Sequence, residues 1–116
     1  MNVQIYHNPR CSKSRQTLAL LQEKKADIEI VAYLKTPPTV EELDVVLNKL
    51  GKEPTEIIRS KESLFKELGL KLDDDRSREE WLAILHENPK LIERPIVIAE
   101  DKAVLGRPPE QVLDLF

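Results

Sequence analysis

The feature that most restricts the fold is a change of hydrophobic period along the 116-residue chain. Short apolar runs over residues 3–6 and 28–32 indicate strands, and the stretch between them, 15–25, has apolar residues at helical spacing. Nearer the C-terminus the strand period returns over 96–99 and 103–105, and the charged residues between these runs predict a tight hairpin. A strand–helix–strand unit followed by an antiparallel hairpin predicts a small mixed sheet with helices packed against it.

The long stretch between these two strand regions has a helical pattern. Two of its helices begin at capping boxes, in which serine or threonine is followed three residues later by glutamate. Helices are expected from Thr39 to Gly51, over 55–59, over 61–68, and from Ser77 to the residue before Pro89. A last helix is expected to open at Pro108, because proline is favoured at the first helical position. We therefore expect one α/β domain over residues 1–116, with a helical insertion over approximately 37–90.

Composition excludes several classes of protein. The formal net charge is −3, so a general nucleic-acid-binding surface is not expected. One cysteine permits no internal disulfide and no cysteine-rich metal site, and the acidic run 73–75 lacks the spacing of a calcium loop. No stretch resembles a membrane span, and the N-terminus lacks a basic-then-apolar signal. We expect a cytoplasmic monomer with no metal, no bound cofactor and no direct contact with nucleic acid or membrane.

The single cysteine, Cys11, lies between the first expected strand and the first expected helix. Unpaired backbone N–H groups and the helix dipole favour a negative charge at a helix N-terminus, and they could also hold an oxyanion. Arg10, Lys13 and Arg15 add positive charge nearby, and His7 can contribute to it. All of these stabilise a thiolate, the form of cysteine that acts as a nucleophile. A buried structural cysteine is the alternative, but the polar and basic neighbours favour a reactive thiol.

Three arginines outside this loop are candidates for binding an anion. Arg94 comes just before one strand of the hairpin and Arg107 just after the other, so both could lie at one edge of the sheet. Arg59 ends a short expected helix. Guanidinium groups suit tetrahedral oxyanions because they donate paired hydrogen bonds in a planar fork. Each arginine could equally be a solvated surface charge, whereas a thiolate beside several arginines would be a site for attack on an oxyanion.

The chain also resembles a known family. Its cysteine segment over residues 7–18, HNPRCSKSRQTL, closely resembles the cysteine motif of the glutaredoxin-dependent arsenate reductase family. That family's other signature segments are similar to residues 58–59, 93–97 and 106–110, in the same order and spacing. The resemblance covers essentially the whole chain. It implies a thioredoxin-like fold with a helical insertion and a cis peptide bond before Pro95.

The resemblance also implies roles for individual residues. Cys11 would be the nucleophile, and His7 would help to lower its pKa. Ser14 would lie near the thiolate and Asn8 would support the loop. The oxyanion would be bound by Arg59, Arg94 and Arg107. The implied reaction is attack of the thiolate on arsenate to form a covalent adduct, followed by attack of glutathione as co-substrate, resolution of the mixed disulfide by glutaredoxin and release of arsenite.

The sequence departs from this family at Ser12-Lys13, where Gly-Thr is usual, so two alternatives stay open. One is a glutathione-linked monothiol oxidoreductase with another substrate. The other is a transcriptional regulator similar to Spx, which binds the C-terminal domain of the RNA polymerase α subunit without turning over a substrate. Redox-sensing regulators of that kind commonly carry Cys-x-x-Cys, whereas this chain has Cys11 and Ser14. Retention of all three arginine positions favours oxyanion chemistry, although a shared fold does not fix function.

Overall fold

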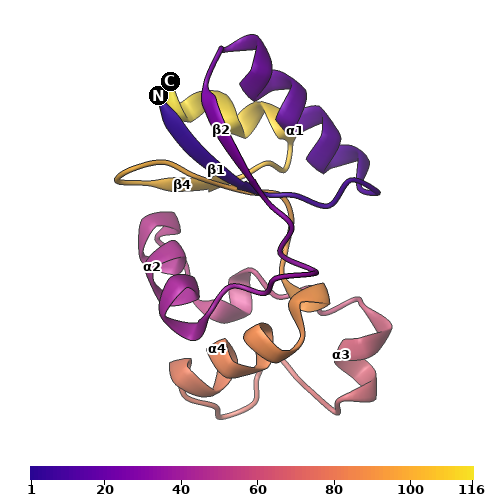
Figure 1. The fold of residues 1–116 in the computed structure, drawn as a ribbon. Coiled ribbons are helices and arrows are strands. Elements are labelled where there is room, and N and C mark those ends of the chain that lie inside the picture. The colour runs from indigo at the N-terminus through magenta and orange to yellow at the C-terminus, as the bar shows by residue number, and fades with distance from the viewer. The chain divides into compact units, whose positions relative to one another are not determined.

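The computed structural model describes residues 1–116 and divides them into two compact units (Figure 1). The sheet unit contains residues Met1–Thr36 and Arg94–Phe116, and the helical unit contains Pro37–Glu93. The expected helical insertion over approximately 37–90 stays a prediction. That the two units make one domain stays a prediction.

The sheet unit has a thioredoxin-like arrangement, as expected from the order of its elements. Its elements are β1 (Asn2–Tyr6), α1 (Ser12–Glu23), β2 (Asp27–Val31), β3 (Ile96–Ile98), β4 (Ala103–Leu105) and the 3-10 helix η3 (Pro109–Leu115). The strands lie in the order β2-β1-β3-β4. β1 is parallel to β2 and antiparallel to β3, and β3 and β4 form the antiparallel hairpin. The expected mixed sheet is therefore confirmed.

The core of the sheet unit lies between the sheet and two helices, α1 and η3, which pack side by side (Figure 1). Val3 and Ile5 alternate along β1 and point to this core, as the period of a strand requires. The other fully or nearly fully buried members come from α1, β3 and η3 and from the residue after β3: Leu21, Val97, Ala99, Val112 and Leu115.

Helix α1 begins at Ser12, three residues earlier than the expected helix over 15–25, so that prediction was wrong at this end. The reason is that the buried residues of its first turns are polar. Ser14 and Thr17 are both completely buried, and with Leu21 they form one face of the helix at spacings of three and four residues. A search for apolar periodicity overlooks such a start.

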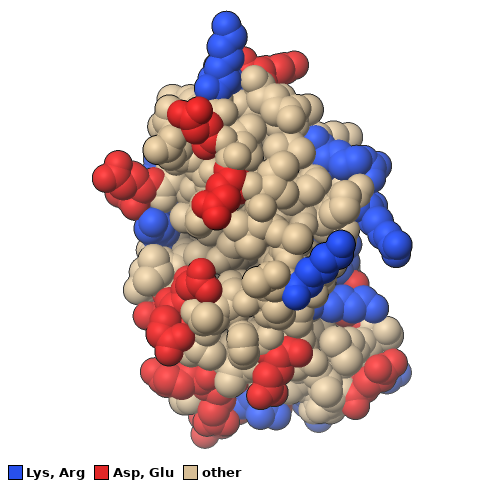
Figure 2. Space-filling view, in the orientation of Figure 1, with Lys and Arg blue, Asp and Glu red and all other residues tan.

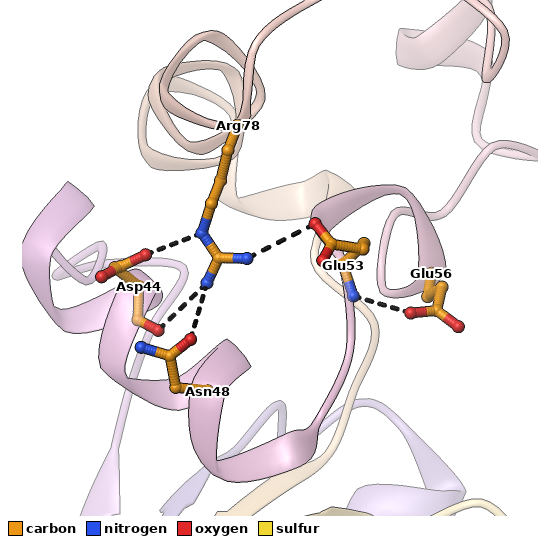
Figure 3. A network of polar contacts seen from close by, with 5 residues as sticks. All are labelled: Asp44, Asn48, Glu53, Glu56 and Arg78. Carbon is orange, nitrogen blue, oxygen red and sulfur yellow. Dashed lines mark hydrogen bonds and ion pairs between the residues drawn. The ribbon is translucent and has the colours of Figure 1, made fainter.

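The helical unit contains α2 (Val40–Leu50), α3 (Ser63–Glu67), α4 (Arg78–Glu87) and the 3-10 turns η1 (Pro54–Glu56) and η2 (Pro89–Leu91). Both predicted capping boxes are present, at Thr39 and Ser77. Arg78 joins the start of α4 to α2 and to the residue before η1, donating to the Asp44 carboxylate at 2.8 Å, the Asn48 side chain at 3.2 Å and Glu53 at 3.4 Å (Figure 3).

Two other helix predictions need correction. The expected helix over 55–59 is only the turn η1, because the next residues, Ile57 and Ile58, are both buried and Ile58 forms an antiparallel bridge with Ile92. The last helix is a 3-10 helix that opens at Pro109 rather than at Pro108. Pro108 is extended, because the residue before a proline is disfavoured in the helical region.

The peptide bond between Arg94 and Pro95 is cis, as expected, and the bond between Arg107 and Pro108 is also cis. None of the helices has the length and apolar character needed to span a membrane.

Charge is distributed unevenly between the two units. The helical unit has 14 Asp and Glu against nine Lys and Arg, a net charge of −5, and its acidic side chains gather on the side of α2 and α4 (Figure 2). The sheet unit has seven Asp and Glu against nine Lys and Arg, a net charge of +2. The sheet unit, which carries Cys11, therefore has a positive net charge although the whole chain is negative.

Candidate active site

Cys11 is the N-cap residue of α1, with extended backbone at φ −95° and ψ 121°. The residue is 9% exposed. The backbone N–H groups of Lys13 and Ser14 lower the pKa of its thiol. No side chain caps α1 and no acidic residue lies in its first turn, whereas α2 and α4 each have a capping box and two first-turn glutamates. The free N–H groups of α1 therefore act on the thiol.

The pKa of the Cys11 thiol results from two opposing effects. Burial is the largest single effect and raises the pKa, because it disfavours the charged thiolate. The N–H of Ser14, the hydrogen bond and charge of Arg94, and the N–H of Lys13 each lower it. Together they outweigh burial, so the pKa lies below its ordinary value of 9.0 and the nucleophilic form is favoured.

Ser14 connects the cysteine loop to His7. Its hydroxyl oxygen lies 2.6 Å from His7 Nδ1 and accepts a hydrogen bond of 3.1 Å from the Asn8 N–H. Burial lowers the pKa of His7, and the charge of Arg15 lowers it further, so the neutral imidazole is favoured. Any influence of His7 on Cys11 would thus pass through Ser14 rather than through a positive charge.

Asn8 stabilises the cysteine loop through hydrogen bonds of both its backbone and its side chain. Its carbonyl accepts from the N–H of Cys11 at 3.0 Å, and its side-chain oxygen accepts from the N–H of Arg10 at 3.0 Å. Arg15 donates to the carbonyl of Pro9 at 2.8 Å. These contacts fix the chain between β1 and α1 and so fix the position of the sulfur. Arg10, Lys13 and Arg15 are all exposed, and basic side chains lie at the end of the sheet unit where α1 begins (Figure 2).

Arg94 and Arg107 meet at Cys11, as the hairpin suggested. Arg107 Nη2 lies 3.9 Å from the Cys11 sulfur, and Arg107 Nε donates to the Arg94 carbonyl at 2.6 Å. The side chain of Arg94 lowers the pKa of the same thiol through hydrogen bonding and through its positive charge. Its Nε is buried and has no hydrogen-bond partner. A buried donor without a partner is uncommon, and an oxyanion beside the thiol would supply an acceptor.

Arg59, the third predicted arginine, belongs to the helical unit. Its guanidinium forms an ion pair with Glu62, and its Nε lies 3.9 Å from a carboxylate oxygen of Glu93. Its role at the site stays a prediction. No group of three or more His, Cys, Asp or Glu side chains could hold a metal ion.

The sequence interpretation missed one residue of the site. Thr17 is completely buried on α1 and donates to the carbonyl of Lys13 at 2.8 Å, and Lys13 is one of the two residues whose N–H groups lower the pKa of the thiol. The sequence contains a signal for the burial of Thr17, because Ser14, Thr17 and Leu21 have the spacing of one helix face.

Comparisons with known proteins identify the family to which the chain belongs. The sequence matches the ArsC family over residues 6–115. It is 52% identical over 114 residues to the uncharacterized protein YfgD of Escherichia coli, covering 97% of this chain and 95% of that protein. It is 47% identical to an arsenate reductase of Haemophilus influenzae, covering 100% of both chains. The solved structure of an arsenate reductase from Vibrio cholerae superposes with a TM-score of 0.94 at 50% identity, covering 100% of this chain and 98% of that one. The chain therefore belongs to the ArsC family.

Proposed function

We propose that the protein is an arsenate reductase that uses glutathione as co-substrate and glutaredoxin as its electron-donating partner. The observation that carries this proposal is the meeting of a thiol of lowered pKa with Arg94 and Arg107 at the start of α1. Relatives that cover nearly the whole chain are named arsenate reductases. The buried, unpartnered Nε of Arg94 supports an oxyanion as the ligand.

In the first step the Cys11 thiolate attacks the arsenic atom of arsenate. A sulfur–arsenic bond forms, and an arsenate oxygen leaves as water after protonation. Arg94 and Arg107 stabilise the negative oxygens, and the N–H groups of Lys13 and Ser14 stabilise the thiolate before attack. We propose Arg59 as a third oxyanion ligand, which would exchange the carboxylates of Glu62 and Glu93 for the substrate.

In the second step the thiolate of glutathione attacks the Cys11 sulfur. A sulfur–sulfur bond forms, and the electron pair of the sulfur–arsenic bond goes to arsenic, which is reduced from As(V) to As(III) and leaves as arsenite. Glutaredoxin then reduces the mixed disulfide and restores the Cys11 thiol. An external thiol is required because the chain has no second cysteine.

Ser14, His7 and Asn8 are proposed as supporting residues. Ser14 acts on the thiolate through its N–H, while its buried hydroxyl connects His7 to the N–H of Asn8. The three residues together hold the loop in the conformation that aims the sulfur at the arginines. This role requires no positive charge on His7.

The test is arsenate-dependent NADPH oxidation in the presence of glutathione, glutaredoxin and glutathione reductase. Cys11→Ser is expected to abolish turnover while leaving the fold intact, since a serine hydroxyl is not ionised at neutral pH. Ser12→Ala, a change at the exposed neighbouring position, is the matched control and should retain turnover. Unchanged turnover in Cys11→Ser would exclude this mechanism. Glutathione-dependent turnover that needs Cys11 but not arsenate would favour the monothiol oxidoreductase instead.

A further inference from the structure

Gly106, which directly precedes Arg107, differs from the other two glycines of the chain. Gly51 and Gly69 have φ of 69° and 70°, and a Cβ added at either would meet nothing within 4 Å. At Gly51 and Gly69 a glycine is favoured because the backbone is in the left-handed conformation, which other residues rarely adopt. Gly106 has no positive φ, but an added Cβ would lie 2.5 Å from Thr17 Oγ1 and 2.7 Å from Pro95 Cγ. Gly106 is therefore required for space and not for backbone conformation.

The atoms that crowd Gly106 cannot easily move. Thr17 is completely buried, and its Oγ1 is held by the hydrogen bond to the Lys13 carbonyl. Pro95 is buried just before β3 and its side chain is a closed ring. Its carbonyl accepts a hydrogen bond from the Gly106 N–H at 2.9 Å. A side chain at position 106 would have to separate the end of β4 from α1 and from Pro95.

This close approach fixes the starting point of the Arg107 side chain. From there Arg107 Nε reaches the Arg94 carbonyl at 2.6 Å and Nη2 reaches to 3.9 Å from the Cys11 sulfur. On the other side of the contact, Thr17 lies on α1 and is hydrogen-bonded to the carbonyl of Lys13, two residues after Cys11. The contact of Gly106 with Thr17 thus connects the arginine to the helix that carries the thiol.

We propose that Gly106, seated against Thr17 and Pro95, is a positioning residue that sets the reach of Arg107 toward Cys11 and thereby the binding of the oxyanion. The inference rests on the proposed function in one respect, that Arg107 binds the substrate oxyanion. A displacement of the kind that a methyl group would force, on the order of 1 Å, is enough to weaken a positioned interaction strongly.

The test is the protection of Cys11 from iodoacetamide by sulfate, a tetrahedral oxyanion that measures anion affinity without adduct formation or turnover. Gly106→Ala is expected to weaken protection about tenfold, approaching the effect of Arg107→Ala, because a charge-assisted hydrogen bond contributes at least that factor. In the Arg107→Ala background the same change should have no further effect, since the position of an absent side chain cannot matter.

Two more variants separate positioning from general destabilisation. Thr17→Ala in the Gly106→Ala background removes the Thr17 atoms at 2.5 Å and 3.1 Å and should restore part of the protection. Gly69→Ala is the control, because it strains a left-handed position that has no close neighbour. It should lower the thermal unfolding temperature and leave anion protection unchanged.

If Gly106→Ala does not fold, Thr17→Val tests the same contact from the helix side. It replaces the hydroxyl facing Gly106 with a larger methyl group and should weaken protection by a smaller factor, again only when Arg107 is present. Unchanged protection in a folded Gly106→Ala, or an equal loss in the Arg107→Ala background, would overturn the inference. If anions protect Cys11 through Arg107 but arsenate gives no turnover, the inference stands and the proposed function falls.

Discussion

Replacing Ser14 by alanine tests whether a buried hydroxyl organises the cysteine loop. Ser14 is 0% exposed, and its oxygen accepts from the Asn8 N–H at 3.1 Å and lies 2.6 Å from His7 Nδ1. Alanine leaves the backbone N–H that acts on Cys11 in place but removes both side-chain contacts. Two polar groups, on Asn8 and His7, then lose their partner.

The expected cost follows from the burial of these two groups. A buried polar group left without a partner costs about 1–3 kcal/mol. His7 and Asn8 are only partly buried, so water can reach them, and we take the lower end of the range, about 1 kcal/mol for each. The free energy of unfolding should fall by about 2 kcal/mol, which lowers the thermal midpoint of a chain of this length by roughly 8 °C.

The assay is chemical and thermal unfolding of Ser14→Ala beside Ser12→Ala. Ser12 is exposed on the same turn of α1, so its substitution should change the free energy of unfolding by no more than about 0.5 kcal/mol. A double-mutant cycle with His7→Ala should show a coupling energy of at least about 0.5 kcal/mol, since the two side chains are in contact. If Ser14→Ala is no more costly than Ser12→Ala, the hydroxyl does not organise the loop and the reasoning is wrong.

Three further predictions concern charge. Arg94→Ala should raise the pKa of Cys11, because the Arg94 side chain lowers that pKa through hydrogen bonding and charge. The pH at which the alkylation rate of Cys11 is half-maximal should move up toward 9.0, and an unmoved midpoint would count against the assignment of Arg94. Folding lowers the pKa of His7 from 6.5. As the pH falls, the unfolded chain therefore takes up the proton before the folded chain does, and the free energy of unfolding decreases from its value above pH 6.5. Unfolding measured from neutral to mildly acidic pH should therefore be less pH-dependent in His7→Gln than in the parent, and an equal slope would contradict the reasoning. Arg78→Ala should lower the free energy of unfolding by about 1–2 kcal/mol, and added salt should reduce this loss because the partners of Arg78 are partly exposed. No loss of stability at low salt would show that the network of Figure 3 is not stabilising.

The elements with strong local signals were predicted well. The capping boxes at Thr39 and Ser77 are present because they involve residues three apart on one helix. The hairpin of β3 and β4 formed where two apolar runs flank a short charged turn. Errors occurred where tertiary contacts outweigh local preference. Ile58 is drawn out of the expected helix by its bridge to Ile92, which no local pattern of the sequence indicates.

The sequence by itself determined that a lone cysteine follows the first strand and precedes a helix, and that arginines flank the hairpin. Connectivity and local backbone preference are sufficient for both. Only the tertiary structure decided that Arg107 reaches the Cys11 sulfur across a separation of 96 residues in the chain. Only the tertiary structure showed that Gly106 has no room for a side chain, because the atoms that exclude one belong to α1 and to the segment before β3. Close packing between distant segments depends on the shape of the folded chain, and a local sequence pattern does not contain that shape.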